Sequence, residues 1–159
     1  AYDSCLQWKD DNVMALNNYA YYLSEKGVDL HKAESMSYKT IKAEPNNGTY
    51  LDTYAWILFM EERYADAKTY IDQALKNRDS TADNSTVLEH AGDIYYMNGM
   101  TDESVDFWKK AYTGENQTEV LAWKIKNRQY ITEEELKKRN APKQKPAATK
   151  KSVRKGKKK

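Results

Sequence analysis

The residues of this chain that could first be expected to do acid–base or nucleophilic chemistry are its two histidines and its single cysteine. His90 and Asp93 stand three positions apart, so on a helix they share one face, where a carboxylate can orient an imidazole base. No motif places a serine or cysteine nucleophile beside them. His90 is therefore interpreted as a helix-surface histidine near an acid, and His31 as a residue of a hairpin turn. The sequence predicts no catalytic residues and no enzyme.

Metal and cofactor sites are equally poorly supported. Two histidines this far apart form no zinc motif, and Cys5 alone excludes an internal disulfide and an all-cysteine metal site. The chain contains no HExxH, P-loop or GxGxxG segment. Trp108 and Tyr112 could suggest a ligand box, but their helical spacing favours packing in a core. We expect no cofactor and no metal.

Composition and charge narrow the fold class. Of the 159 residues 40% are hydrophobic, glycine (6) and proline (3) are scarce, and no run of about eighteen apolar residues occurs. A turn-rich β fold and a membrane span are therefore disfavoured. Charge is divided unevenly, because 137–159 holds twelve of the 26 lysines and arginines and none of the 24 acids. Residues 1–136 are left with 14 bases against 24 acids, a net charge of −10.

Apolar residues recur at helical spacing in the stretch LDTYAWILFMEERYADAKTYIDQAL, residues 51–75. One helical face consists of Leu51, Tyr54, Ala55 and Leu58. A second apolar face follows between Tyr64 and Leu75. The charged residues 61–63 lie between the two faces, so the stretch is predicted to form two helices joined by a turn.

The same hairpin pattern occurs three times along the chain. Small residues at the equivalent helical position, Ala20, Ala55 and Gly92, are 35 and 37 residues apart. Small side chains are needed where two helices cross closely. A period near 34 residues with a small residue in each first helix resembles the tetratricopeptide repeat family. The resemblance implies an all-α fold, a right-handed superhelix of stacked antiparallel helical hairpins with a C-terminal capping helix. The basic tail is predicted to be disordered because it is nearly free of aliphatic residues larger than alanine and its like charges repel.

The repeat pattern also predicts how the chain is divided. We expect the end of a preceding repeat at 1–12, a repeat at 13–47, a repeat plus loop at 48–84, a repeat at 85–115, capping helices at 116–139 and a disordered basic tail at 140–159. Within these segments the expected helices are hairpins at 13–44, 48–76 and 85–113, a helix near 118–128 and helical residues at 1–8. Asn116 or Thr118 suits the N-cap of the helix near 118–128, and Thr132 with Glu135 fits a capping box.

In arrays of this family the first helices of the hairpins line a concave groove. The apolar stripe of each first helix assigns its packed face, so the opposite face is predicted to line the groove. The predicted groove residues are Asn17, Asn18, Tyr21, Asp52, Thr53, Trp56, Met60, Glu89, His90 and Asp93. Two interpretations of Trp56 stay open, an anchor for a partner or packing on the first helix of the adjacent repeat.

The resemblance implies a non-catalytic scaffold or adaptor that binds a protein or peptide partner in the groove. Tetratricopeptide domains that hold a C-terminal carboxylate use Lys, Arg and Asn on this face. Lysine and arginine are absent from the predicted face here, and acids with aromatic residues stand in their place. An extended or helical peptide with basic and apolar groups is therefore the expected ligand.

The phrases LDTYAWILF, EHAGDIYYMNG and FWKKAY are similar to the last repeats of bacterial tetratricopeptide proteins that include cell-envelope lipoproteins. This similarity favours the periplasm or the outer membrane, with the cytoplasm as the alternative. A rival hypothesis lets the basic tail bind nucleic acid or an anionic lipid surface while the repeats recruit partners. The tail equally suits folding back on the acidic body, or a solubilising role with no fixed partner. A third hypothesis makes the repeats the regulatory end of an enzyme with an upstream catalytic domain.

Overall fold

Residues 10–142 are described by the computed structural model, and they contain eight α-helices and one short 3₁₀ helix. The elements are α2 (Asp10–Lys26), α3 (Leu30–Ala43), α4 (Gly48–Met60), α5 (Tyr64–Lys76), α6 (Ser85–Met97), α7 (Thr101–Ala111), η1 (Gly114–Asn116), α8 (Glu119–Asn127) and α9 (Glu133–Asn140). The predictions for 1–8 and for 143–159 of the basic tail concern residues outside this range.

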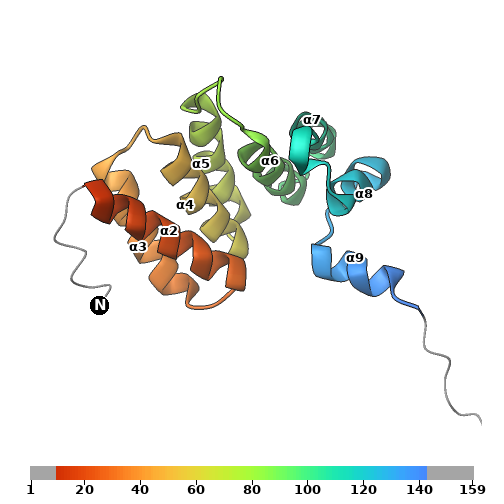
Figure 1. Cartoon of the computed structure of the whole chain (residues 1–159), viewed down its shortest axis with the longest axis horizontal. Helices are drawn as coiled ribbons and strands as arrows, with labels where there is room; N and C mark the ends of the chain where they lie inside the picture. Colours follow the sequence, from red (N-terminus) through yellow and green to blue (C-terminus); the bar gives the residue numbers. More distant parts are fainter. Residues whose placement is uncertain (1–9, 143–159) are drawn as a thin grey trace, which may run out of the picture.

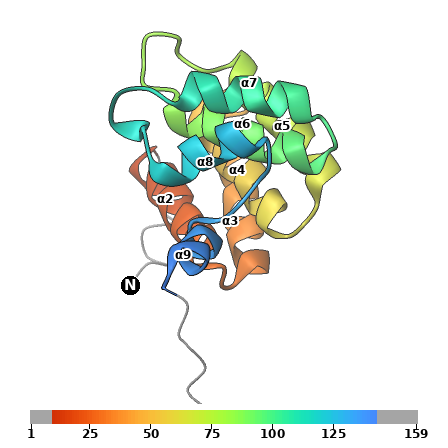
Figure 2. The ribbon, with the colours of Figure 1, turned by 90° about the vertical axis from the view of Figure 1, so that its right-hand side faces the viewer.

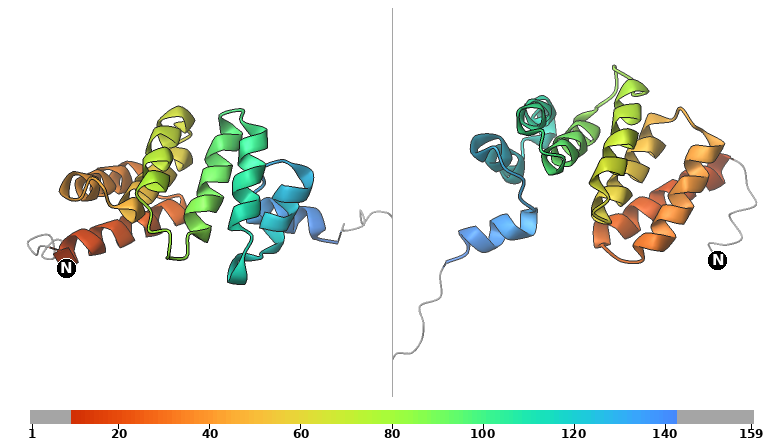
Figure 3. Two further views of the ribbon diagram at one scale, coloured as in Figure 1. Left: turned by 90° about the horizontal axis from the view of Figure 1, so that it is seen from above. Right: turned by 180° about the vertical axis from the view of Figure 1, so that it is seen from behind.

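Three helical hairpins, α2–α3, α4–α5 and α6–α7, follow one another in chain order (Figure 1). Neighbouring hairpins are joined by contacts of α3 with α4 and of α5 with α6, while α2, α4 and α6 contact one another in turn. α8 packs on α7, and α9 lies at the far end of the chain (Figure 2). Figure 3 shows the paired helices from two further sides. No strand occurs in residues 10–142, so the predicted all-α solenoid is confirmed.

The stretch 51–75 forms two helices, as its broken stripe predicts. α4 ends at Met60 and α5 begins at Tyr64, and Glu62 between them has a left-handed φ of 63°. The backbone N–H of Arg63 donates to the carbonyl oxygen of Leu58 at 2.9 Å, which closes the end of α4. The charged turn therefore reverses the chain and folds α5 back along α4.

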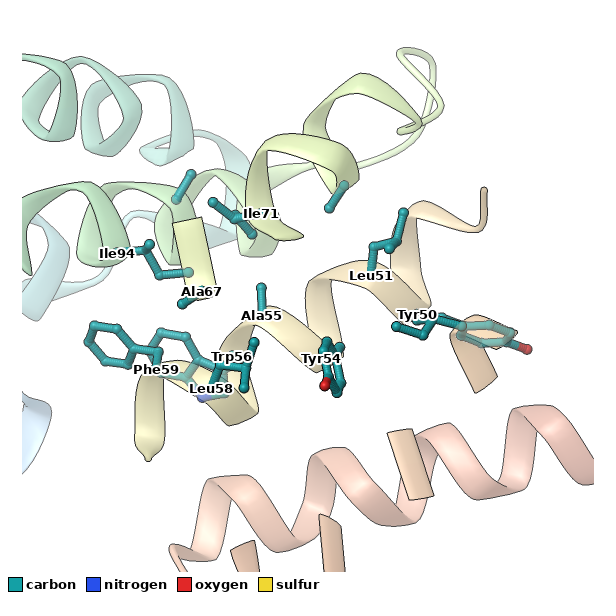
Figure 4. Packing of buried hydrophobic residues seen from close by; sticks show 13 residues of the cluster. Tyr50, Leu51, Tyr54, Ala55, Trp56, Leu58, Phe59, Ala67, Ile71 and Ile94 are labelled. Carbon is teal, nitrogen blue, oxygen red and sulfur yellow. The ribbon is translucent and has the colours of Figure 1, made fainter. Parts of the chain in front are cut away.

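Two of the three small residues of the repeat, Ala55 and Gly92, lie at close helix crossings. Ala55 is fully buried and faces Ala67 and Ile71 of α5 (Figure 4). A Cβ added to Gly92 would lie only 2.3 Å from Cδ1 of Trp108 on α7. A larger side chain at either position would push the two helices of its hairpin apart.

The C-terminal caps largely follow the prediction. The Thr118 hydroxyl accepts from the backbone N–H of Leu121 at the start of α8, whereas the Asn116 amide donates to the carbonyl oxygen of Ala111. Thr132 and Glu135 form the expected capping box of α9. Trp108 is fully buried in a cluster with Leu121 beneath α8, which supports packing over a ligand box.

Candidate functional site

The surface formed by α2, α4 and α6 is hollowed in two places. The first hollow, called here the N-terminal pocket, has a volume of about 580 Å³ and lies among α2, α4 and the α5–α6 loop at 77–84. The second, called the C-terminal pocket, has a volume of about 490 Å³ and lies between α2, α4 and α6 on one side and the segment 130–134 on the other. Tyr21 lines both pockets, so the two hollows adjoin.

The structure brings all ten predicted groove residues to these two pockets. The N-terminal pocket is lined by Asn17, Asn18, Tyr21, Asp52 and Thr53. The C-terminal pocket is lined by Tyr21, Trp56, Met60, Glu89, His90 and Asp93. The apolar pattern predicted this surface because one face of each first helix packs in the core, so the opposite face must line the surface.

His90 is not a surface histidine, and that expectation is wrong. Its side chain is buried on α6, with only 6% of the residue exposed, and its Nδ1 lies 2.9 Å from Oδ1 of Asp52 on α4. Burial alone would lower the pKa of His90, but the carboxylates of Asp52, Asp93 and Glu89 outweigh it and raise that pKa above its ordinary value. The acid bound to the imidazole comes from the neighbouring repeat, and the pair joins α4 to α6.

Trp56 packs inside the molecule. It is 9% exposed, and its indole stacks on the ring of Phe59 with centroids 4.6 Å apart and on the imidazole of His90 at 4.1 Å. His90 belongs to the first helix of the next repeat. The main contacts of Trp56 are therefore those expected if it packs on the adjacent repeat. A partner in the C-terminal pocket can reach only the remaining edge of this side chain.

Lys124 supplies a cation that the sequence reasoning missed on this surface. Its Nζ lies 2.8 Å from Oδ1 of Asp93 and 2.9 Å from Oε2 of Glu89, and its side chain is buried. Burial favours the neutral amine, but the two carboxylates outweigh it and raise the pKa of Lys124. Asp93 also accepts from Nε1 of Trp108 at 2.9 Å. The negative potential predicted from Glu89 and Asp93 is therefore largely neutralised within the chain.

The segment between α8 and α9 crosses the C-terminal pocket. The ring of Tyr130 meets the ring of Phe59 edge-on with centroids 5.7 Å apart, and Ile131 beside it is buried. Burial, followed by the nearby Asp93 and Glu135 carboxylates, raises the pKa of Tyr130. The chain itself thus covers part of the surface formed by the first helices.

Asn17 is the least satisfied side chain of the N-terminal pocket. It is 4% exposed, and its Oδ1 accepts no hydrogen bond from any residue in 10–142. Buried acceptors in native proteins are almost always paired. Asp79 and Asp83 line the same pocket from the loop, where hydrogen bonds from Thr81 and from Ser85 hold the pKa of each carboxyl below its usual range.

One group of side chains outside the pockets has the residue types of a metal site. The ligand atoms of His31, in the first turn of α3 rather than in the hairpin turn, lie within 4.8 Å of those of Glu34 and Glu61. Arg63 pairs with Glu34 at 2.9 Å and with Glu61 at 3.4 Å, so a cation already balances both carboxylates. Burial and the adjacent Glu34 raise the pKa of Glu61.

Within residues 10–142 no helix is long and apolar enough to cross a membrane.

Comparison with known proteins gives one curated relative of moderate identity. No family model matches the chain. A TPR repeat-containing protein of Pseudomonas aeruginosa is 35% identical over 66 residues, which make up 42% of this chain and 11% of that protein. The match therefore spans only about a tenth of the relative's length. The similarity to cell-envelope proteins stays a prediction.

Solved structures share the fold at low identity. The first TPR of Spaghetti (RPAP3), bound to the HSP90 peptide SRMEEVD, is 12% identical with a TM-score of 0.64, over 76% of this chain and 92% of that one. The N-terminal domain of stress-induced protein-1 (STI-1) from C. elegans is 20% identical with a TM-score of 0.57, over 74% and 94%. The TPR2AB domain of yeast Sti1, in a pHSP90 complex, is 22% identical with a TM-score of 0.55, over 81% and 48%.

Proposed function

We propose that this chain, which has the fold of tetratricopeptide repeat domains, is a non-catalytic scaffold that binds a peptide segment of another protein along the surface of α2, α4 and α6. The two adjoining pockets on that surface carry the proposal. Concave surfaces with a few convergent polar groups are the usual sites of ligand binding, and stacked helical hairpins present such surfaces to extended partners.

Two solved structures with the same fold support a peptide as the ligand class. The first TPR of Spaghetti is bound to an HSP90 peptide, and the Sti1 domain is in a complex with pHSP90. These peptides are ligands of the two solved proteins, which resemble this chain in fold. The chemistry of the peptide for this chain follows from its own pocket residues.

Charge on the two pockets favours a peptide with basic and apolar groups. Asp52 is paired with His90, and Glu89 and Asp93 are paired with Lys124. The other acids that line the pockets are Glu25, Asp79, Asp83, Glu133 and Glu134. Arg78 and Lys124 are the lysines and arginines in those linings, and Lys124 is already paired with two carboxylates. Like charge would repel a peptide that ends in a free carboxylate, whereas a basic peptide is attracted. The tail-based rival function concerns residues outside 10–142 and stays a prediction.

Site-directed photo-crosslinking in cells tests the proposal. A photoreactive phenylalanine analogue replaces Tyr21, which lies where the two pockets meet, or Tyr38 of α3, which is 46% exposed and lines neither pocket. We expect covalent adducts with a partner from position 21 and few from position 38. Both substitutions keep an aromatic ring, so both variants are expected to fold, and the variant at position 38 is the control for the variant at position 21.

Two outcomes would contradict binding at the proposed surface. Adducts from position 38 that match or exceed those from position 21 would move the binding surface to the second helices of the hairpins. Adducts from neither position, with both variants folded and abundant, would leave the pockets without a protein ligand.

A further inference from the structure

We propose that residues 128–132, called here the strap, occupy the place of the partner on α4 and are displaced when the partner binds there. The strap then also indicates the chemistry of the partner segment, which presents an aromatic residue followed by an aliphatic one, as Tyr130 and Ile131 do. This inference rests on the function proposed above and assigns the ligand of the C-terminal pocket.

The strap lies on the surface of the first helices as a bound peptide segment would. After α8, Arg128 turns the chain with a left-handed φ of 55°, and residues 130–132 form no helix (Figure 2). The ring of Tyr130 meets the ring of Phe59 on α4 edge-on with centroids 5.7 Å apart, and Ile131 is only 2% exposed. Both strap side chains line the C-terminal pocket together with residues of α2, α4 and α6.

Side-chain packing alone attaches the strap to that surface. Its hydrogen bonds within residues 10–142 run to other elements, because the Arg128 guanidinium donates to Asp102 of α7 and Thr132 donates to Glu135 of α9. In this part of the chain none joins the strap to α2, α4 or α6. The Arg128–Asp102 pair is exposed and therefore stabilises little. A segment held in this way can open locally while the helices beneath it stay folded.

The helix that precedes the strap is anchored independently of it. Lys124 of α8 pairs with Asp93 and Glu89 of α6, and neither contact involves a strap residue. Release of the strap therefore leaves α8 docked on α6. It uncovers the ring of Phe59 and one side of the Lys124 ammonium, whose Nζ lies 5.5 Å from the centroid of the Tyr130 ring.

The uncovered place suits an aromatic ring with an aliphatic neighbour. An edge-on contact with Phe59 and an ammonium near the ring both favour an aromatic side chain over an aliphatic one at the position of Tyr130. The burial of Ile131 shows that an aliphatic side chain fits next to it, in a pocket of about 490 Å³. Because the strap belongs to the same chain, it competes with a free peptide at an effective concentration on the order of millimolar.

Fluorine NMR of the full chain tests the exchange. The chain has two phenylalanines, so labelling with 4-fluorophenylalanine gives one signal beside the strap, from Phe59, and a reference signal from Phe107 of α7. The double variant Tyr130→Ser, Ile131→Ser empties the strap, and the Phe59 signal should move because the neighbouring ring is lost. The acetylated and amidated peptide NRQYITE, the sequence of residues 127–133, should return this signal saturably toward its original position.

Matched comparisons separate this exchange from nonspecific binding. The unmodified chain should bind NRQYITE at least about tenfold more weakly than the double variant, because its own strap competes. The peptide NRQSSTE should leave the Phe59 signal of both proteins in place. Tyr38→Ser, at an exposed tyrosine outside both pockets, should bind NRQYITE as the unmodified chain does. Circular dichroism verifies folding, and Tyr130→Ser, which keeps the buried Ile131, replaces the double variant if that variant is unfolded.

Two results would overturn the inference. One is a Phe59 signal that NRQYITE leaves unmoved in the folded variant with the emptied strap. The other is equal affinity of NRQYITE for that variant and for the unmodified chain. Either result would make the strap a fixed part of the fold. Crosslinks from position 21 do not depend on the strap peptide, so the scaffold function and this inference fail separately.

Discussion

The ammonium of Lys124 lies 2.8 Å from the carboxylate of Asp93, and this buried pair ties α8 to α6. Replacing Lys124 with methionine keeps much of the side chain but leaves Asp93 and Glu89 without their cation. Breaking a buried ion pair on one side costs about 3–5 kcal/mol, and we expect the free energy of unfolding in urea to fall by that order. Lys126→Met, at an exposed lysine of the same helix, should change it by less than about 0.5 kcal/mol.

A second substitution checks the origin of that loss. In the Lys124→Met background, Asp93→Asn should recover part of the stability, because an amide needs no cation and can still accept from Nε1 of Trp108. A Lys124→Met variant as stable as the unmodified protein would show that the pair contributes nothing.

Gly92 offers a steric test of the α6–α7 crossing. A methyl group there would lie 2.4 Å from Nε1 of Trp108 and 3.0 Å from the backbone oxygen of Ser104. Overpacking of this kind costs about 1–3 kcal/mol, so Gly92→Ala should lower the thermal midpoint. In a Trp108→Phe background the same change should cost less, and equal costs in both backgrounds would place the clash elsewhere.

The sequence predicted the helices well because their signals are local. The stripe around Ala55 and the charged turn at Glu62 lie within a few residues of the structure that they specify. The pairing of His90 with Asp52 could not be found in this way, since the two residues belong to different repeats. Lys124 stands out in the sequence as a charged residue inside the apolar stripe of a short helix. Its partners could not be predicted, because they lie on a different helix, α6.

The pH dependence of stability should report on His90. Its raised pKa means that the native state holds the proton more tightly than the unfolded chain does. The resulting stability is fully present below about pH 6.5, the ordinary histidine value, and is lost as pH rises through the native pKa. The difference in unfolding free energy between the unmodified protein and His90→Gln should therefore shrink as the pH is raised from about 5.5 to about 9, because the imidazole loses its proton over this range.

The raised pKa of His90 is caused by the carboxylates that face its imidazole, those of Asp52, Asp93 and Glu89. Asp52→Asn removes the nearest one and should flatten the difference attributable to His90. A difference that grows with pH, or one that Asp52→Asn leaves unaltered, would contradict the raised pKa.

Trp56 should behave as a core residue. Because its indole stacks between Phe59 and His90, Trp56→Ala should cost about 3–5 kcal/mol in guanidinium denaturation. Tyr22→Ala, at an aromatic residue that is exposed on α2, is the control and should cost far less. A Trp56→Ala protein of normal stability that loses its crosslinked partner would restore the indole as a binding anchor.

The contact between Tyr130 and Phe59 changes how unfolding can spread through the molecule. In a linear array each repeat touches only its neighbours, so the last unit can fray while the others stay intact. Here the segment after α8 reaches past the α6–α7 hairpin to α4. Loss of the C-terminal end would therefore expose Phe59 of α4 as well as the α7 helix on which α8 packs, so the last unit is coupled to the α4–α5 hairpin directly and not only through the repeat between them.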